Sequence, residues 1–442
     1  MQSSRRRSMS FLALTLVVLT WSPRMGASQG HNPAMADFET LIFCGAAACS
    51  ACHAAADSQR GADPDDGPVI VGLWSAGIMA YGSDDPFFQA KVRSEVLRAP
   101  EHRGLIEAKC SACHNLKTPY PVVQGQIVGE DPPEQMILSE WHSGDSASFE
   151  DPTGCQQCHL PTEDDGHTAG RPPWLDERAH AWHAFVCANT ESLSLLAMET
   201  ALQGGDPAPL LASVDAGREL LTHAGELELL AATLHDGTLE FAIRIGNLTG
   251  HKLPTAFPSR RVYLHAVVKD DRGEIVFESG AMMHDGRITG VDSDEDPGAF
   301  EPHHRTISRP DQVQVYEAVM GNTDDNVTVT LLRASQYLKD NRIVPPGFDP
   351  ATAAEDIRPA GYSLNDPDFG FGHDEITYQL GGLAESRYQV SVELRHQAIS
   401  YPYLRDLAEL SDDPVISRFL NLYDAVRPGS ELIAALVFEV GG

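Results

Sequence analysis

The chain has 442 residues, enough for two domains, and 42% of them are hydrophobic, which is typical of a globular protein. It carries 63 Asp and Glu against 32 Lys and Arg, so its formal net charge is −31 at pH 7. This charge makes nucleic acid and anionic membranes poor partners. The negative charge can serve solubility or life in a saline habitat, or it can serve docking to a basic redox partner. We favour the first interpretation.

The first 28 residues (1–28) are typical of an export signal. Three arginines at positions 5–7 form a charged start, an apolar run covers residues 9–21, and small residues around Ala27 offer a cleavage site. The apolar run is too short for a comfortable membrane span, and no later stretch reaches about 18 apolar residues. We expect the mature chain in the periplasm or outside the cell, with no membrane span.

Three C-x-x-C-H motifs follow, each with two thiols three positions apart and a histidine directly after them. They consist of Cys49, Cys52 and His53; Cys110, Cys113 and His114; and Cys155, Cys158 and His159. Two thiols at this spacing can bond the two vinyl groups of one porphyrin, and the adjoining imidazole can bind its iron. A redox dithiol or half a zinc site would not need that histidine. The motifs therefore predict three covalently attached haem c groups, with the three histidines as proximal ligands.

Short helices are predicted between the motifs. Residues 86–97 carry a loose helical stripe, with an Asp or Ser cap ahead of Pro86 in the first turn. Further helices are predicted at residues 101–110 and 133–142. A porphyrin is a large apolar plate that can replace core side chains. We therefore expect residues 29–190 to form a haem-packed domain that is mainly helical and rich in loops.

The pattern changes twice in the remaining chain. Leucines between Leu193 and Leu234 recur at helical spacing, with breaks at two prolines, and predict a helical bridge over residues 191–236. From residue 237 to 442 the hydrophobic period is two, which is typical of strands. We predict strands at residues 238–245, 261–268, 274–278, 312–319, 326–333, 375–380 and 387–399, with a hairpin turn at 270–273.

Several short antiparallel strands separated by turns predict a β-sandwich for residues 237–442. The fold class is then α+β with several domains: a haem-packed N-terminal half and a C-terminal antiparallel β-sandwich. The acidic cluster at residues 292–296 lacks the spacing of a specific calcium site and is interpreted as a solvated loop.

Several segments together resemble a family of exported multihaem c-type cytochromes. The family is allied to the tetrahaem electron carrier of ammonia oxidisers and to hydroxylamine-oxidoreductase-like proteins. The third motif, G-C-Q-Q-C-H-L-P, is similar to that family's third-site motif, with Leu160 in place of its usual Met. The other matching segments lie at residues 74–87, 183–189 (H-A-F-V-C-A-N), 250–255 (G-H-K-L-P-T), 258–261, 312–317 and 337–342 (Y-L-K-D-N-R). The resemblance implies electron transfer in a redox chain outside the cytoplasm and leaves any substrate open.

Of the eight cysteines, only Cys44 and Cys187 lie outside the motifs. In an exported protein, two leftover thiols most simply form one disulfide. Cys187 stands where the related segment has glycine. If it pairs with Cys44, the start of the mature chain is tied beside His183.

Each iron also has a second axial position, whose occupant controls the reduction potential and decides between transfer and catalysis. We predict His183, which follows the third motif beside Phe185, and His251, in a Gly-His-Lys loop at the mouth of the sandwich. We also predict His303, which the resemblance favours over His304. The weaker candidates are His142, His102 and Met79.

The predicted function is a trihaem c-type cytochrome that relays single electrons between redox proteins outside the cytoplasm. No residue is predicted to be catalytic, since G-x-S-x-G, H-E-x-x-H and phosphate-binding loop motifs are absent from the sequence. One alternative is an oxidoreductase that acts on a small nitrogen or sulfur species at an open haem. Another is self-association into an extracellular cytochrome filament, in which a histidine of one subunit ligates the haem of the next.

Overall fold

The computed structural model describes residues 70–114, 158–160, 162–163, 180–181, 184–349, 353 and 357–441. All of them belong to one of two compact units of the chain, Asn32–Gly442. The predicted export signal, the first C-x-x-C-H motif and the predicted helix at residues 133–142 lie outside the described residues. Within the described ranges, no helix is both long enough and apolar enough to cross a membrane.

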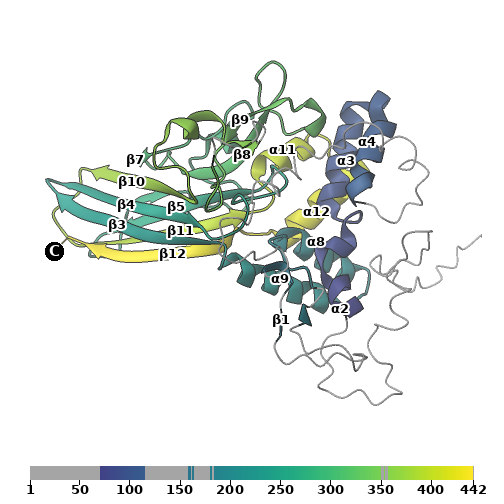
Figure 1. Cartoon of the computed structure of the whole chain (residues 1–442), viewed down its shortest axis with the longest axis horizontal. Helices are drawn as coiled ribbons and strands as arrows, with labels where there is room; N and C mark the ends of the chain where they lie inside the picture. Colours follow the sequence, from purple (N-terminus) through teal and green to yellow (C-terminus); the bar gives the residue numbers. More distant parts are fainter. Residues whose placement is uncertain are drawn as a thin grey trace, which may run out of the picture. The chain divides into compact units, whose positions relative to one another are not determined.

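The C-terminal half is built on two β-sheets (Figure 1). One has the strand order β3-β4-β10-β7, in which only β7 runs parallel to its neighbour. The other has the order β12-β11-β5-β8-β9, with β6 also paired to β5, and is antiparallel throughout. The strands are β3 (Gly225–His235), β4 (Thr238–Asn247), β5 (Arg261–Lys269), β6 (Ile275–Ser279), β7 (Thr306–Ile307), β8 (Val315–Gly321), β9 (Gln336–Asp340), β10 (His373–Gly381), β11 (Tyr388–Gln397) and β12 (Glu431–Val440).

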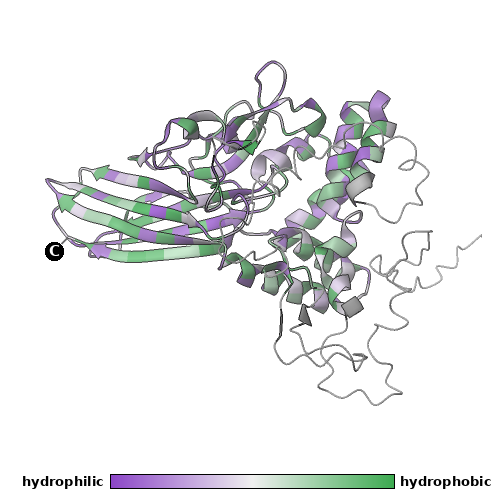
Figure 2. Cartoon of the chain, in the orientation of Figure 1, coloured by the Kyte–Doolittle hydropathy of each residue, from purple (hydrophilic) through white to green (hydrophobic). Residues whose placement is uncertain are grey.

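One hydrophobic core lies between the sheets. Alternate residues of β4 are fully buried, and the same alternation in β5, β10 and β11 supplies the facing side chains. Figure 2 shows hydrophobic and hydrophilic residues alternating along several of these strands. Phe241 of β4 stacks on Tyr378 of β10, with ring centroids 4.6 Å apart. Burial of a large apolar side chain of this kind stabilises the fold by about 1.5–3 kcal/mol. The helices in the N-terminal part and the antiparallel sheets in the C-terminal half confirm the α+β fold class.

One predicted helical segment and one predicted strand were wrong. Residues 225–235, placed in the helical bridge, form strand β3 instead. Asp236 and Gly237 both have positive φ and form a tight turn, and the hairpin pairs β3 with β4. The predicted strand at residues 326–333 contains only one isolated bridge and a short 3-10 turn. Its backbone binds helix α3 (Pro86–Arg98) instead, because Lys91 donates to the Val329 carbonyl and Glu95 accepts from Leu331 N–H.

The helices pack together and join the two halves of the sequence. Helix α3 begins as predicted, with Pro86 in its first turn and Asp85 accepting from Phe87 N–H at 2.8 Å. Lys91 and Arg98 of α3 both form salt bridges with Asp406, at 3.2 and 2.8 Å. The remaining helices with bounds are α2 (Ile70–Ala76), α4 (Arg103–His114), α8 (Thr190–Leu202), α9 (Ala208–Leu221), α10 (Asp292–Glu295), α11 (Tyr401–Ala408) and α12 (Pro414–Val426).

Helices α11 and α12 were not predicted, although their sequence lies in the predicted sandwich domain. Their buried side chains, including Leu404 and Phe419, share a core with Phe87 of α3 and Leu195 of α8. Helix α8 is also fixed to the end of β11, since Glu191 accepts from the backbone N–H groups of residues 398 and 399. The C-terminal part of the chain therefore supports the helices that follow and precede the haem motifs.

Candidate haem sites

The second motif lies at the end of helix α4, close to α3. Cys110 and His114 are four residues apart on this helix, so their side chains share one face. The His114 ring stacks on Phe88 of α3, with ring centroids 4.1 Å apart. Its Nδ1 lies 3.2 Å from the Gly82 carbonyl oxygen. A Cβ added to Gly82 would lie 3.2 Å from the backbone oxygen of His114, so a side chain there would crowd the motif.

The third motif is tied to the segment that leads into helix α8. Val186 N–H donates to the His159 carbonyl at 2.9 Å. In return, His159 Nδ1 lies 2.6 Å from the Val186 carbonyl oxygen. The ring and the backbone of His159 are therefore both held by one residue that lies beyond the motif.

His251, in the loop after β4, lies opposite His159. The two ring centroids are 6.4 Å apart, and the ring planes are inclined by 22°. Two imidazoles that share one metal ion through bonds of about 2 Å have ring centres roughly 6 Å apart. The separation of the two ring centroids is therefore compatible with one shared iron, with His159 as the predicted proximal ligand and His251 as the predicted ligand on the other side.

His114, His159 and His251 share one feature of hydrogen bonding. The Nδ1 atom of each faces a backbone carbonyl oxygen, which for His251 is that of Lys252 at 2.9 Å. A carbonyl oxygen only accepts, so Nδ1 carries the proton, and the neutral ring keeps its lone pair on Nε2. This tautomer binds a metal through Nε2, and the bond to the carbonyl orients the ring. The donor set therefore fits haem iron.

The loop that carries His251 is organised by Asn247, the last residue of β4. The Asn247 side chain accepts from Thr249 N–H at 2.8 Å and donates to the His251 carbonyl at 2.8 Å. The Thr249 hydroxyl lies 2.8 Å from the same His251 carbonyl oxygen. Sequence reasoning missed both residues, because an Asn and a Thr in a loop carry no signal of what they hold. The bonds fix the backbone from which the imidazole projects.

The other predicted residues are placed as follows. Cys158 is described beside His159, and Cys113 lies in helix α4 with the other residues of its motif. Met79 is 61% exposed, and His102 is exposed beside Glu101. The residues outside the described ranges are Cys44, Cys49, Cys52, His53, His142, Cys155 and His183.

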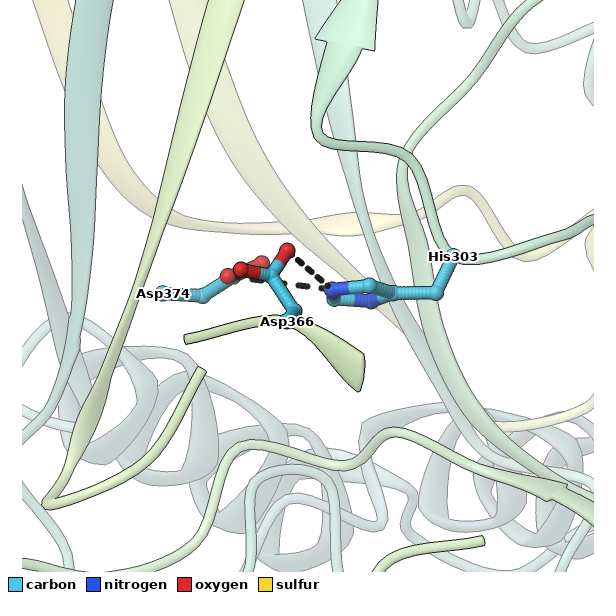
Figure 3. A group of neighbouring side chains, drawn as sticks. All are labelled: His303, Asp366 and Asp374. Atoms are coloured by element: carbon cyan, nitrogen blue, oxygen red, sulfur yellow. Dashed lines mark hydrogen bonds and ion pairs between the residues drawn. The ribbon is translucent and has the colours of Figure 1, made fainter. Parts of the chain in front are cut away.

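His303, in the connection that leads to β7, is buried and faces Asp366 and Asp374 (Figure 3). Its Nε2 lies 3.2 Å from an oxygen of Asp366 and 3.8 Å from one of Asp374, and the three side chains could in principle hold a metal ion. On the other side of the ring, Nδ1 faces the side-chain amide nitrogens of Gln314 and Asn341, at 3.0 and 3.1 Å.

The orientation of both amides is fixed by backbone groups. The Gln314 oxygen accepts from His304 N–H, and the Asn341 oxygen accepts from Glu317 N–H. Nδ1 of His303 must then be the acceptor, so the proton sits on Nε2 and points at the carboxylates. Burial lowers the pKa of His303 to about 4, against the opposing charge of Asp366.

The role of His303 as an iron ligand stays a prediction, and it would require a change in this hydrogen bonding. Nε2 would have to lose its proton while Nδ1 also lacked one, which is the form of an imidazolate. Burial also raises the pKa of Asp374 well above its ordinary value, although Tyr316 donates a hydrogen bond to it at 2.7 Å. We interpret His303, Asp366 and Asp374 as a hydrogen-bonded group of the sandwich interior.

The acidic cluster at residues 292–296 is only partly a solvated loop. Asp294 is buried, and its carboxylate accepts two hydrogen bonds of 2.8 Å from Arg261 and one of 2.7 Å from Ile288 N–H. For Asp294 the prediction was wrong, because a distant arginine on β5 supplies the counter-charge.

Comparisons with known proteins add little to this geometry. The sequence matches no family model and no curated protein. Among solved structures, the chain is similar to a penta-heme cytochrome c552 from Thermochromatium tepidum, with 14% identity and a TM-score of 0.36. The match covers 68% of this chain and half of that one. A similarity of this size does not establish a common fold.

Proposed function

We propose that this chain is an exported c-type cytochrome that relays single electrons through three covalently attached haems. The three C-x-x-C-H motifs support the number of haems, and the N-terminal sequence supports a place outside the cytoplasm. When bound, haem supplies a one-electron couple between ferric and ferrous iron. The strongly acidic chain would exchange electrons with redox proteins that present basic surfaces.

One observation carries the proposal: His159 of the third motif faces His251 of the sandwich at 6.4 Å between ring centroids. One partner is local to the motif, and the other comes from a distant loop held by β4. Both rings are in the tautomer that binds a metal through Nε2. Two protein ligands on one iron favour electron transfer there, because no axial position is left for a substrate.

The protein's contribution is to orient these ligands. The Val186 and Lys252 carbonyls each accept the Nδ1 proton, so neither ring needs to rotate or lose a proton to meet the iron. Such a small structural change at the ligands suits a protein that carries electrons. His114 is prepared in the same way by the Gly82 carbonyl.

The test is to export the full chain in a host that attaches haem c and to purify the holoprotein. We expect a pyridine haemochrome value of three haems per chain and a ferric spectrum dominated by low-spin iron. A haem count other than three would overturn the number of sites. A high-spin iron that binds nitrite or hydroxylamine would instead favour the oxidoreductase alternative.

A further inference from the structure

The loop that carries His251 is attached to a buried ionic group at the end of β9. Lys252, directly after the histidine, is 1% exposed, and its Nζ lies 2.7 Å from an oxygen of Asp340, which is fully buried. Arg342 binds the same carboxylate through Nε and a terminal nitrogen, at 2.8 and 2.7 Å. One carboxylate thus accepts from two cations, and one of these cations is the neighbour of the iron ligand.

The backbone strengthens the same connection. Leu253 and Ile343 exchange two hydrogen bonds of 2.9 Å. Asn247, which holds the His251 carbonyl, also donates to the Ile343 carbonyl at 2.8 Å. The loop is therefore joined to residues 340–343 at three places: an ion pair, a two-bond bridge and a shared amide.

Residues 339–343 are in turn fixed to strand β8. Asn341 donates to the Val315 carbonyl at 2.8 Å and accepts from Glu317 N–H at 3.0 Å. Asp340 is itself paired with Ala318 in the ladder between β8 and β9. Because these contacts fix the backbone around Asp340, its carboxylate is held at a defined place.

The buried ion pairs of Asp340 are not explained by a gain in the stability of the fold. Buried ion pairs lose much of their attraction to desolvation, and well-packed apolar residues of similar size often stabilise a protein as well. A salt bridge differs in that it fixes one atom to one partner. Burial alone would raise the pKa of Asp340, but Arg342 and Lys252 more than offset this and hold it below its ordinary value.

We propose that Asp340, acting through Lys252 and supported by Arg342, is a positioning residue that keeps the His251 imidazole opposite His159. This assigns a role to the Y-L-K-D-N-R segment at residues 337–342, which touches no haem motif in the described part of the chain. The inference rests on the proposed function. It deepens that function by placing control of the distal ligand in the interior of the sandwich.

The test compares Lys252→Met with Lys339→Met in the holoprotein. Both lysines are 1% exposed and pair with a buried carboxylate. Lys252→Met leaves Asp340 paired with Arg342, whereas Lys339→Met removes the salt bridge of Glu317 to Lys339. Each variant thus removes one buried lysine salt bridge, but only Lys252 belongs to the His251 loop.

The readout is the rate at which carbon monoxide binds the reduced protein, with His251→Ala defining an uncovered iron. Loss of a residue that supports a metal ligand typically lowers metal affinity or activity about 10–100-fold. We expect carbon monoxide to bind Lys252→Met about 10–100-fold faster than wild type, and Lys339→Met at the wild-type rate. Lys252→Arg, which keeps the charge, should restore slow binding.

Equal rates for Lys252→Met and Lys339→Met, with fast binding in His251→Ala, would overturn the positioning role alone. Unchanged binding in His251→Ala would instead overturn the His159–His251 pairing on which it rests. If Lys252→Met gives no holoprotein, Lys252→Gln retains a donor and most of the side chain, and the same comparison applies to it.

Discussion

His251 and His303 make an instructive pair, because both lie in connections of the C-terminal half and both were predicted as iron ligands. His251 lies in the loop after β4 and faces the third haem motif. His303 lies in the interior of the sandwich and faces two aspartates. His251 is partly exposed, whereas His303 is buried.

Hydrogen bonding at Nδ1 separates the two histidines. His251 meets a carbonyl oxygen there, which demands a proton on Nδ1 and leaves Nε2 as the metal-binding atom. His303 meets two amide N–H groups, which demand a lone pair and move the proton to Nε2. The tautomer is set by the adjoining residue in His251 and by residues farther along the chain in His303. The following predictions test that difference.

The largest effect is expected at the iron. Replacing His251 by Ala should remove the distal ligand of the third haem, so that carbon monoxide binds one iron per chain that is closed in wild type. His303→Ala should leave the spectrum and carbon monoxide binding unchanged. Absorption spectra of the reduced proteins measure both. The comparison fails if the two variants respond alike.

For the stability of the fold, we expect the larger effect from His303→Ala instead of His251→Ala. His303→Ala leaves the Asp366 carboxylate without its ring donor and opens a cavity, and we expect a loss of about 3 kcal/mol in the free energy of unfolding. Urea unfolding followed by circular dichroism measures this loss. A cost below about 1 kcal/mol would show that the aspartates and amides do not depend on the imidazole.

The same histidine predicts a pH dependence. The pKa of His303 is lowered to about 4 in the folded chain, against about 6.5 when unfolded. The unfolded chain therefore takes up the proton first as pH falls. This contribution to stability is complete above pH 6.5 and is lost between about pH 6.5 and 4, by roughly 3 kcal/mol. The wild-type advantage over His303→Ala should shrink across this window, and a constant advantage would contradict the assignment.

The smallest effect is expected in the His251 loop itself. Thr249→Val keeps the shape of the side chain and removes the hydroxyl that lies 2.8 Å from the His251 carbonyl oxygen. One lost hydrogen bond of this kind costs about 1 kcal/mol. Carbon monoxide should then bind faster than in wild type but slower than in Lys252→Met. Binding faster than in Lys252→Met would place the main support of the loop at Thr249.

Much of the sandwich could be predicted because its signals are local. Strict alternation in residues 238–245 and 375–380 predicted strands β4 and β10, and the turn at residues 270–273 predicted the hairpin to β6. Strand β3 was missed because its leucines fit a helical period as well as an alternating one. Its pairing with β4 resolved the ambiguity, and the Asp236-Gly237 turn was the signal that had been overlooked.

The sequence by itself predicted the haem attachment motifs and their proximal histidines, because thiol and imidazole spacing within five residues is a local property of the chain. Only the tertiary structure brings His251 and His159 side by side. His251 reaches His159 because β4, Asn247 and the Lys252–Asp340 pair place its loop there. The proton of His303 is kept on Nε2 by two amides, whose oxygens accept from the backbone N–H groups of His304 and Glu317. Long-range contacts of this kind leave no pattern in residue spacing.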